Sequence, residues 1–336
     1  MLAPVIEGAT TMRTILLGAL CLGLSAGAAA ADDSSAALAA GGLVLTKQAD
    51  IRMASEDLYL SPKEARVRYA FVNDGPKDID TIVAFPMPDI DVREFWYEPL
   101  GTTLDAAPNF MGFALKVDGK PVEARAEERA FLDGRDVTAK VRGAGLPVNI
   151  VGRGLIDALK HLSPADRKVL LAAGLIEDDS GDLHPHWIAQ TRFWWRQRFP
   201  AGKPVAIEHR YQPVTGESFF GDYSLKDKEQ SAYNEKNYCI DAATRRTIEA
   251  RIAAAKKANP QGGGYLKAYA TAFVLKTANN WNGPIGRFHL TLDKLKPANV
   301  LSLCWDGALR KTGATTFEAT RDNFAPARDL RLLVLE

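Results

Sequence analysis

Residue types that usually build catalytic and metal centres are scarce in this sequence. Its 336 residues include 5 histidines and 3 cysteines. Zinc usually takes three or four well-placed His, Cys or carboxylate ligands, and the pair His184 and His186 in an acidic segment favours an exposed turn over a metal site. Residues 32–336 also contain no G-x-S-x-G nucleophile motif, no Cys–His signature and no G-x-x-x-x-G-K-[ST] phosphate loop. The sequence therefore predicts no catalytic residue, no metal and no cofactor.

An excess of either charge is missing as well. Lysine and arginine number 42 against 41 acidic residues, so the formal net charge is +1. Proteins that bind nucleic acid usually carry a basic stripe, and polybasic segments mark proteins that bind anionic membranes. The balance argues against nucleic acid as the main partner and gives no support for an anionic membrane surface.

Apolar runs long enough to cross a membrane are not found. The run Ile15–Leu24 has ten residues, whereas a spanning helix needs about 20. It follows Arg13 and precedes the small-residue segment Ser25–Ala31, which is the arrangement of a secretory signal peptide. We therefore predict a signal peptide over residues 1–31, cleaved before Asp32.

Two alternatives to a signal peptide, a membrane anchor and a lipoprotein site, are less well supported by the sequence. A membrane anchor would need a longer apolar run. A lipoprotein site at Cys21 would need a leucine three places earlier and a small residue directly before it, where this chain has Gly18 and Leu20. Whether Met1 or Met12 is the true start stays open. The mature chain is expected to be periplasmic or secreted, with no membrane span after cleavage.

Two cysteines, Cys239 and Cys304, remain after cleavage. An even number in an exported chain predicts a disulfide, and the alternative is two separate buried thiols. Closing so long a loop would stabilise the fold by about 4 kcal/mol in the chain-entropy account.

Alternating patterns predict a mainly β fold. Ser61–Pro88 reads as a hairpin of two strands, because alternate residues from Ala65 to Phe71 are apolar and the second strand is closed by Pro86. Phe110–Arg125 reads as a second hairpin, with Asp118 and Gly119 suited to the positive φ angles of its turn. Further strands are predicted in residues 188–211 and in the C-terminal third.

Helical patterns interrupt the strands. Glu127–Arg142 is expected to be partly helical, and a helical hairpin is expected from Arg153 to Gly174, with Ser163 as the N-cap of its second helix. One further helix is predicted over Ala242–Ala258. Gly216–Lys236 reads as a long loop.

The resulting architecture is mainly β, with antiparallel sandwich-like regions, an inserted helical hairpin and one further helix. An N-terminal β-region would span residues 32–215 with its helical insert at about 127–180, and a C-terminal β-region would span residues 216–336.

One cluster has the composition of a binding surface. A tryptophan beside amides and a carboxylate suits a sugar or a peptide, since the ring stacks and the amides form hydrogen bonds. The alternative is a packed ring with asparagines in turns, and this reading is favoured. The candidate ligand-binding residues are Asn279, Asn280, Trp281, Trp305 and Asp306.

Two further features were weighed as sites. The loop Asp89–Asn109 contains the acidic residues Asp89 and Asp91 and three adjacent aromatics. A loop of this length is either functional or packed by its own side chains, and its aromatics favour packing. His209 lies in an apolar stripe, which favours a hydrogen-bonded core histidine over a pH-sensitive switch.

Several segments together resemble domain-of-unknown-function family 4424, a set of exported bacterial proteins with no assigned activity. They include VAFPMPDID, VDGKPV, ERAFLDGRDVT, FPAGKPVAIEHRYQPVTG, TANNWNGPIGRFHLTLDK and SLCWDG. The resemblance implies a secreted or periplasmic protein and supplies no catalytic residues. A shorter stretch is similar to the β-domain of vault and inter-α-trypsin-inhibitor proteins, which implies a β-sandwich used in interaction.

The function expected is that of a non-catalytic exported binding or scaffold protein, whose partner is an unknown envelope protein or glycan. The alternative is a cell-wall or polysaccharide-acting enzyme with its site near Trp281 and Trp305.

Overall fold

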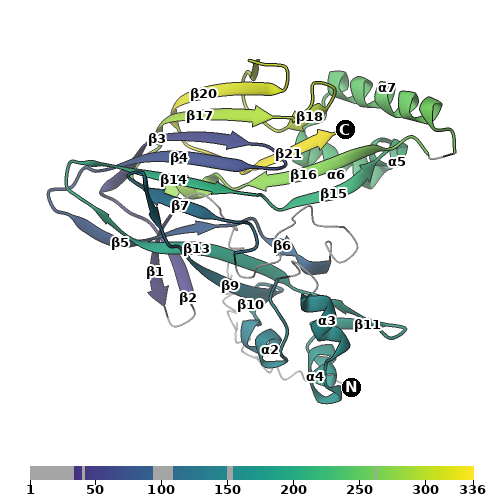
Figure 1. Cartoon of the computed structure of the whole chain (residues 1–336), viewed down its shortest axis with the longest axis horizontal. Helices are drawn as coiled ribbons and strands as arrows, with labels where there is room; N and C mark the ends of the chain where they lie inside the picture. The colour runs from purple at the N-terminus through teal and green to yellow at the C-terminus, as the bar shows by residue number, and fades with distance from the viewer. Residues whose placement is uncertain (1–33, 40–41, 94–108, 150–153, 262) are drawn as a thin grey trace, which may run out of the picture.

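Two large β-sheets face each other and enclose most of the buried apolar side chains (Figure 1). The computed structural model describes residues 34–39, 42–93, 109–149, 154–261 and 263–336. The predicted signal peptide and the aromatic residues 95–97 lie outside these ranges.

Sheet A has the strand order β10-β9-β13-β5-β1-β2, and β6 also pairs with β13. Its strands are β1 (Ser34–Ala39), β2 (Gly42–Thr46), β5 (Ile79–Pro86), β6 (Ile90–Asp91), β9 (Arg125–Leu132), β10 (Arg135–Asp136) and β13 (Ile188–Phe199).

Sheet B has the order β19-β20-β17-β3-β4-β14-β7-β8. Neighbouring strands run antiparallel, except that β17 lies parallel to β3. Its strands are β3 (Ile51–Leu60), β4 (Ala65–Asn73), β7 (Ala114–Val117), β8 (Lys120–Val122), β14 (Pro204–Tyr211), β17 (Ile285–Asp293), β19 (Arg310–Lys311) and β20 (Thr316–Phe324).

Sheet C, of order β15-β16-β21-β18, forms a layer between the main core and three helices. Its strands are β15 (Thr215–Phe220), β16 (Leu266–Phe273), β18 (Val300–Leu303) and β21 (Leu330–Leu335). Leu332 and Val334 face the core, whereas Leu333 and Leu335 face the helices, as the two-residue period of a strand requires. The helices are α5 (Asp222–Lys226), α6 (Lys228–Tyr238) and α7 (Ala242–Ala258).

The helical insert extends from the far end of sheet A (Figure 1). It contains α2 (Thr138–Gly143), α3 (Gly154–Lys160), α4 (Pro164–Ala172) and the small hairpin β11 (Ile176–Asp179) and β12 (Asp182–Pro185). The predicted N-cap is present, because the Asp166 amide donates to Ser163 Oγ at 3.1 Å.

The predicted fold class is confirmed, and so are several local elements. The molecule is mainly β and largely antiparallel, with the helical hairpin inserted as expected. The helix Ala242–Ala258 has the predicted bounds. Asp118 and Gly119 have positive φ angles of 48° and 76° at the tip between β7 and β8.

The predicted Ser61–Pro88 hairpin is wrong. Both strands exist, but β4 pairs with β3 and β14 in sheet B, whereas β5 pairs with β13 and β1 in sheet A. The turn between them therefore crosses from one sheet to the other. Alternation identifies a strand and its buried face, but it does not identify the neighbouring strand.

Two other expectations need correction. Glu127–Leu132 belongs to strand β9, which pairs with β13, so the helix in this segment is limited to α2. The predicted loop Gly216–Lys236 contains β15, α5 and most of α6. The C-terminal part thus has three helices where one was expected.

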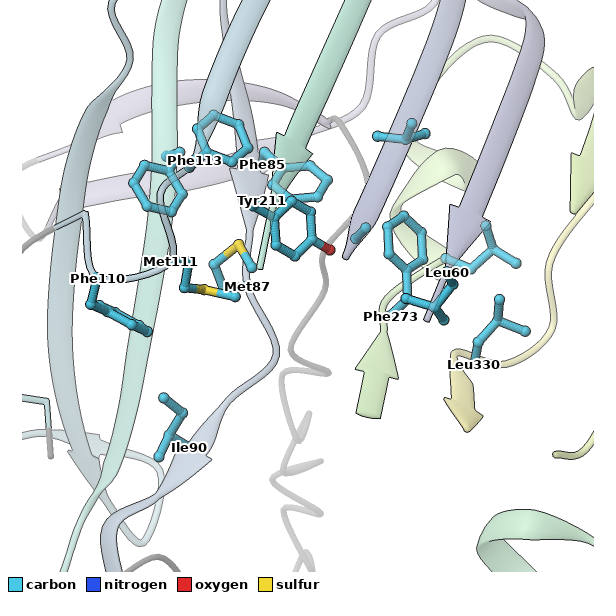
Figure 2. Close-up of a cluster of buried hydrophobic side chains, with 14 of the residues drawn as sticks. Leu60, Phe85, Met87, Ile90, Phe110, Met111, Phe113, Tyr211, Phe273 and Leu330 are labelled. Carbon is cyan, nitrogen blue, oxygen red and sulfur yellow. The ribbon is translucent and has the colours of Figure 1, made fainter. Parts of the chain in front are cut away.

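The predicted boundary at residue 215 does not separate two sheets. Strands β17, β19 and β20 come from the C-terminal part of the chain, and they complete sheet B beside β3. Aromatic side chains fill the space between sheets A and B, where the Phe113 and Phe193 rings stack at 4.3 Å between centroids. Figure 2 shows how Leu60, Phe273 and Leu330 continue this apolar layer toward sheet C.

Candidate ligand-binding cleft

The residues of the predicted Asn-Asn-Trp cluster hold the fold together. Trp281 is 3% exposed and packs against Phe71 and Phe199, with ring centroids 4.7 and 6.0 Å away. Asn279 donates to the carbonyl oxygen of Pro326 at 2.9 Å. In this arrangement the ring of Trp281 cannot stack on a ligand from solvent.

Asn280 connects the short helix η1 (Lys276–Asn280) to the N-terminal strands. Its Nδ2 donates to Ser34 Oγ at 2.9 Å, and its carbonyl oxygen accepts from the Gln48 amide at 2.7 Å. These bonds engage the backbone carbonyl group of Asn280 and one N–H of its side-chain amide within the fold.

Trp305 and Asp306 lie elsewhere, at a half-open cavity of about 440 Å³. The Trp305 ring contacts the rings of Phe288 and Phe324 at 5.9 and 5.8 Å between centroids. The guanidinium of Arg321 stands 5.9 Å from the same ring. The structure therefore separates the predicted surface into a buried part at Trp281 and a half-exposed part at Trp305.

A larger cleft, of about 480 Å³, opens where sheet A, sheet C and helix α6 meet. Sheet A contributes the corner Pro88–Asp91 that follows β5, together with Ile188. Sheet C contributes residues of β16 and β21, and α6 contributes Tyr233 and Tyr238. The sequence places these segments far apart, so only the fold brings them together.

Asp89 is the most perturbed acid of this cleft. Burial raises the pKa of its carboxyl group to about 6, although a hydrogen bond from Gln190 and the charge of Arg192 act in the opposite direction. Gln190 Nε2 donates to Asp89 Oδ2 at 3.1 Å. Asp89 as a whole residue is exposed, and it lines the cleft.

The other charged groups of the cleft are already engaged or lie at its rim. Asp91 forms an ion pair with Arg93 at 2.8 Å. Asp329 Oδ1 accepts from the amides of Leu275 and Lys276, both at 3.0 Å. Arg331 also lines the cleft, while Arg93 and Arg192 act on Asp91 and Asp89 from beside it.

The walls of the cleft combine apolar and aromatic side chains. Ile90 and Val274 are buried in it, whereas Tyr233 on α6 is 48% exposed. The rings of Tyr233 and Tyr238 meet edge to face at 6.5 Å between centroids. An apolar wall beside an accessible carboxylate is typical of a pocket for a small organic molecule.

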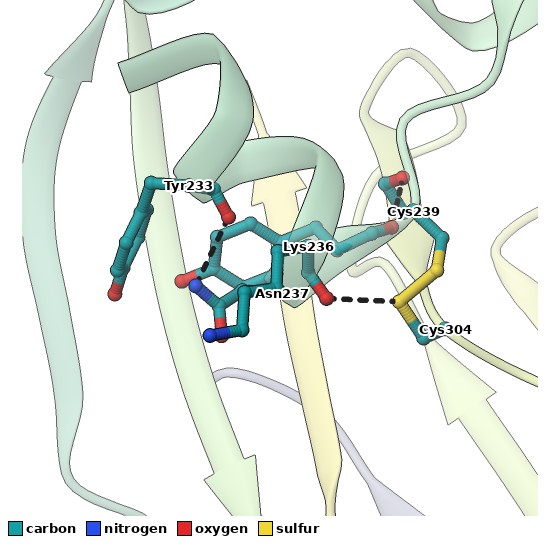
Figure 3. Close-up of a disulfide and its surroundings, with 7 residues drawn as sticks. Tyr233, Lys236, Asn237, Cys239 and Cys304 are labelled. Carbon is teal, nitrogen blue, oxygen red and sulfur yellow. Dashed lines mark hydrogen bonds between the residues drawn. A yellow bond between two sulfur atoms is a disulfide. The ribbon is translucent and has the colours of Figure 1, made fainter. Parts of the chain in front are cut away.

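The predicted disulfide is present and fastens α6, the helix that carries both tyrosines (Figure 3). Cys239 follows the last residue of α6, and its Cα atom lies 4.9 Å from that of Cys304, directly after β18. Ser302 Oγ also donates to the Tyr238 carbonyl oxygen at 2.8 Å. The tyrosine side of the cleft is thus held against sheet C.

Sequence reasoning assigned Asp89 and Asp91 to a loop and favoured packing for that loop. The position of Asp89 in the sequence could have identified it. It lies between Pro88 and Ile90, soon after a buried strand, and such a carboxylate is placed at the edge of a core. Within the described ranges, no cluster of three or more His, Cys, Asp or Glu residues is arranged to hold a metal. None of the helices in those ranges has the length and apolarity needed to cross a bilayer.

No curated protein matches the chain. Among solved structures, it is similar to a "putative nutrient binding protein" from Legionella pneumophila subsp. pneumophila, with 14% sequence identity and a TM-score of 0.46. The similarity covers 91% of this chain and 70% of that one.

The sequence profile described as domain of unknown function DUF4424 matches residues 31–333. The match includes both cysteines of the disulfide and every segment that lines the cleft. It confirms the resemblance drawn from the sequence motifs, and the chain therefore belongs to the DUF4424 family.

Proposed function

We propose that this protein is a non-catalytic exported binding protein whose cleft at Asp89 takes a small organic cation with an apolar body. The accessible carboxylate of Asp89, desolvated enough to raise its pKa to about 6, carries the proposal. A bound ammonium group would stabilise the ionised carboxylate and offset that desolvation. The apolar part of the ligand would contact Ile90 and Val274.

The aromatic wall fits the same class of ligand. A cation near the face of a tyrosine is attracted by the ring quadrupole, and the half-exposed ring of Tyr233 borders the cleft. Asp91 pairs with Arg93, and Asp329 accepts two backbone amides, so the proposed contact for the cation is Asp89. An anionic ligand of the same shape would be repelled by the ionised Asp89 carboxylate.

Export is part of the proposal. The family match begins at residue 31, where cleavage of the predicted signal peptide is expected. The disulfide suits an oxidising compartment. N-terminal sequencing of the protein recovered from the periplasmic fraction should read Asp32 as the first residue, and a mature chain that still begins at Met1 or Met12 would contradict export by cleavage.

Calorimetric titration with phenethylammonium tests the cleft. We expect binding at pH 7.5 that weakens as the pH falls through about 6, because protonated Asp89 no longer attracts the cation. Asp89→Asn keeps the size of the side chain and should weaken binding by about tenfold or more, the usual cost of losing a charged hydrogen-bond partner.

Asp306→Asn is the matched control, since it removes one carboxylate from the cavity beside Trp305. It should leave the titration unchanged. Equal binding of phenylacetate, which has the same ring and the opposite charge, would overturn the assignment of a cationic ligand. A wild-type chain that binds neither compound would overturn the cleft as a site for aryl-alkyl amines.

The alternative function, a cell-wall or polysaccharide-acting enzyme, placed its site near Trp281 and Trp305, and Trp281 is buried. It required an open cleft at Trp281, and that ring lies in solid core between Phe71 and Phe199. No observation on the described residues favours it over binding.

A further inference from the structure

A third cavity, of about 410 Å³, lies between helix α7 and the segment that leads into β18. Thr244, Thr247 and Arg251 line it from the helix, where their spacing of three and four residues places them on one face. The opposite wall is the segment 297–303 together with Lys294. It is separate from the cleft at Asp89, with which it shares no lining residue.

Lys294 is an unusual member of this lining because it is 9% exposed. Its ammonium group donates to the carbonyl oxygens of Pro297 at 2.8 Å and Asn299 at 2.7 Å. An ammonium group has three N–H donors, so these bonds leave a third, and the centroid of the Phe317 ring lies 6.0 Å from the ammonium nitrogen. Within the described part of the chain, no carboxylate forms an ion pair with it. A buried cation without an anion is unfavourable.

Two further cations act on the same ammonium group. The pKa of Lys294 is lowered first by burial and then by the positive charges of Lys311 and Arg251. Lys311 lies opposite Phe317 in the pairing of β19 with β20, and Phe317 is part of the cavity wall. Neither Lys311 nor Arg251 forms an ion pair with a carboxylate of the described residues. Lys294 and Arg251 thus line one cavity, and the exposed Lys311 acts on the same ammonium group, without a paired carboxylate from these parts of the chain.

One carboxylate, Asp241, also lines the cavity, but at its other end. It is the N-cap of α7 and accepts from the Thr244 amide at 2.7 Å. Asp241 precedes Arg251 by ten residues, which corresponds to about 15 Å along a helix. It is therefore committed to the start of the helix and does not neutralise the group at Lys294.

We propose that this cavity binds a small anion, whose oxyanion group is held by Lys294 and Arg251 with Lys311 beside them. The third N–H of the ammonium and the guanidinium fork would supply charged donors. The neighbouring wall is apolar and half-exposed, which would accept a short hydrocarbon part. It is formed by Val300, Leu301, Leu303, Leu309 and Phe317.

The probes are inorganic phosphate and octanoate, titrated separately into the intact mature chain at low ionic strength. Binding of either supports the proposal, and the tighter of the two shows whether the site takes a free oxyanion or an acid with an apolar tail. Absence of binding for both at millimolar concentration would overturn it.

Arg251→Gln is the decisive variant, because Arg251 is only half-buried and its loss should leave the fold intact. Binding should weaken by about tenfold, the usual effect of removing one charged hydrogen bond. Arg246→Gln removes the same charge from an exposed position of the same helix that does not line the cavity, and it should leave binding unchanged.

Equal losses in Arg251→Gln and Arg246→Gln would show attraction to the net charge only and would refute the site. Asp89→Asn provides an independent check. It should leave anion binding unchanged, so that failure of the cleft at Asp89 and failure of this cavity are distinguishable.

Discussion

Asn73 Nδ2 donates a hydrogen bond to the carbonyl oxygen of Phe199 at 2.9 Å and thereby ties the end of β4 to the end of β13. The same nitrogen donates to the carbonyl oxygen of Lys77 at 2.8 Å, and Asn73 Oδ1 accepts from the Gly75 amide at 3.0 Å. Since β4 and β13 belong to opposite sheets, one buried amide fixes two connections that cross the sandwich, from β4 to β5 and from β13 to β14.

Replacing this amide should loosen both connections at once. We expect Asn73→Ala to lower the free energy of unfolding by about 3 kcal/mol, because buried backbone groups lose their partners. Asn237→Ala is the control, since its side chain bonds only the Tyr233 carbonyl oxygen within α6, and it should change stability by less than about 1 kcal/mol. Urea unfolding measures both, and equal effects would contradict the role given to Asn73.

Trp281→Ala should destabilise the protein strongly. The ring is 3% exposed against Phe71 and Phe199, and its removal leaves a cavity that costs about 4 kcal/mol. Tyr265→Ala, at a ring that is 56% exposed, should cost less than about 1 kcal/mol. Guanidinium unfolding separates the two cases, and a Trp281 variant as stable as the wild type would show that the ring is not core.

Reduction of the disulfide should destabilise helix α6 more than the sandwich of sheets A and B. The bond joins residues 65 positions apart, and a loop of that length contributes about 4 kcal/mol in the chain-entropy account. Hydrogen exchange under reducing conditions should therefore rise in α6 and little in β4. The double variant Cys239→Ala, Cys304→Ala should give the same result without reductant and no further change with it.

His209 should make the protein sensitive to mild acid. Burial lowers the pKa of its imidazole to about 3, and the ring lies among Phe85, Phe113 and Trp195. The imidazole is protonated near pH 6.5 in the unfolded chain but only near pH 3 in the folded chain. The stability that the neutral, buried imidazole contributes is therefore complete above pH 6.5. It is lost at up to about 1.4 kcal/mol per pH unit as the pH falls.

His209→Gln removes this titrating group. The test compares how much the free energy of unfolding changes with pH in the variant and in the wild type. The wild type should lose more stability than the variant between pH 7 and pH 4 in urea unfolding. Parallel pH profiles would mean that the imidazole is protonated in the folded protein.

Asp89 should act in the opposite direction. Its raised pKa means that the folded chain holds a proton that the unfolded chain has released, so wild-type stability falls as the pH rises from about 4 to about 6. Asp89→Asn should therefore be the more stable protein above pH 6, by on the order of 1 kcal/mol after solvent screening at its exposed edge. The gain should vanish below about pH 4, and a gain independent of pH would rule out titration of Asp89 as its cause.

Local signals in the sequence were sufficient for elements that depend on neighbouring residues. The bounds of α7, the Ser163 cap and the Asp118–Gly119 turn follow from side chains within a few positions of one another. Strand partners depend on residues far away, which explains why β4 and β5 were paired with each other. The charged strand β9 was read as partly helical because only its pairing with β13 explains its conformation.

The candidate site shows the same limit. Trp281 was singled out for its residue type and its neighbours, yet its burial depends on Phe71 and Phe199, both far away in the sequence. Asp89 was visible as an acid in a loop, but its perturbed carboxyl group depends on Gln190 and on sheet C across the cleft. A single sequence identifies the residues of such a site and leaves their assembly open.

The parallel pairing of β3 with β17 also determines when the fold can be completed. A chain that grows from its N-terminus makes Ile51–Leu60 first, and more than 200 residues separate it from the strand that covers that edge, Ile285–Asp293. Contacts of such long range form slowly, so the nascent chain keeps an open edge until Ile285–Asp293 has been made. We therefore expect sheet B to be completed late during synthesis on the ribosome.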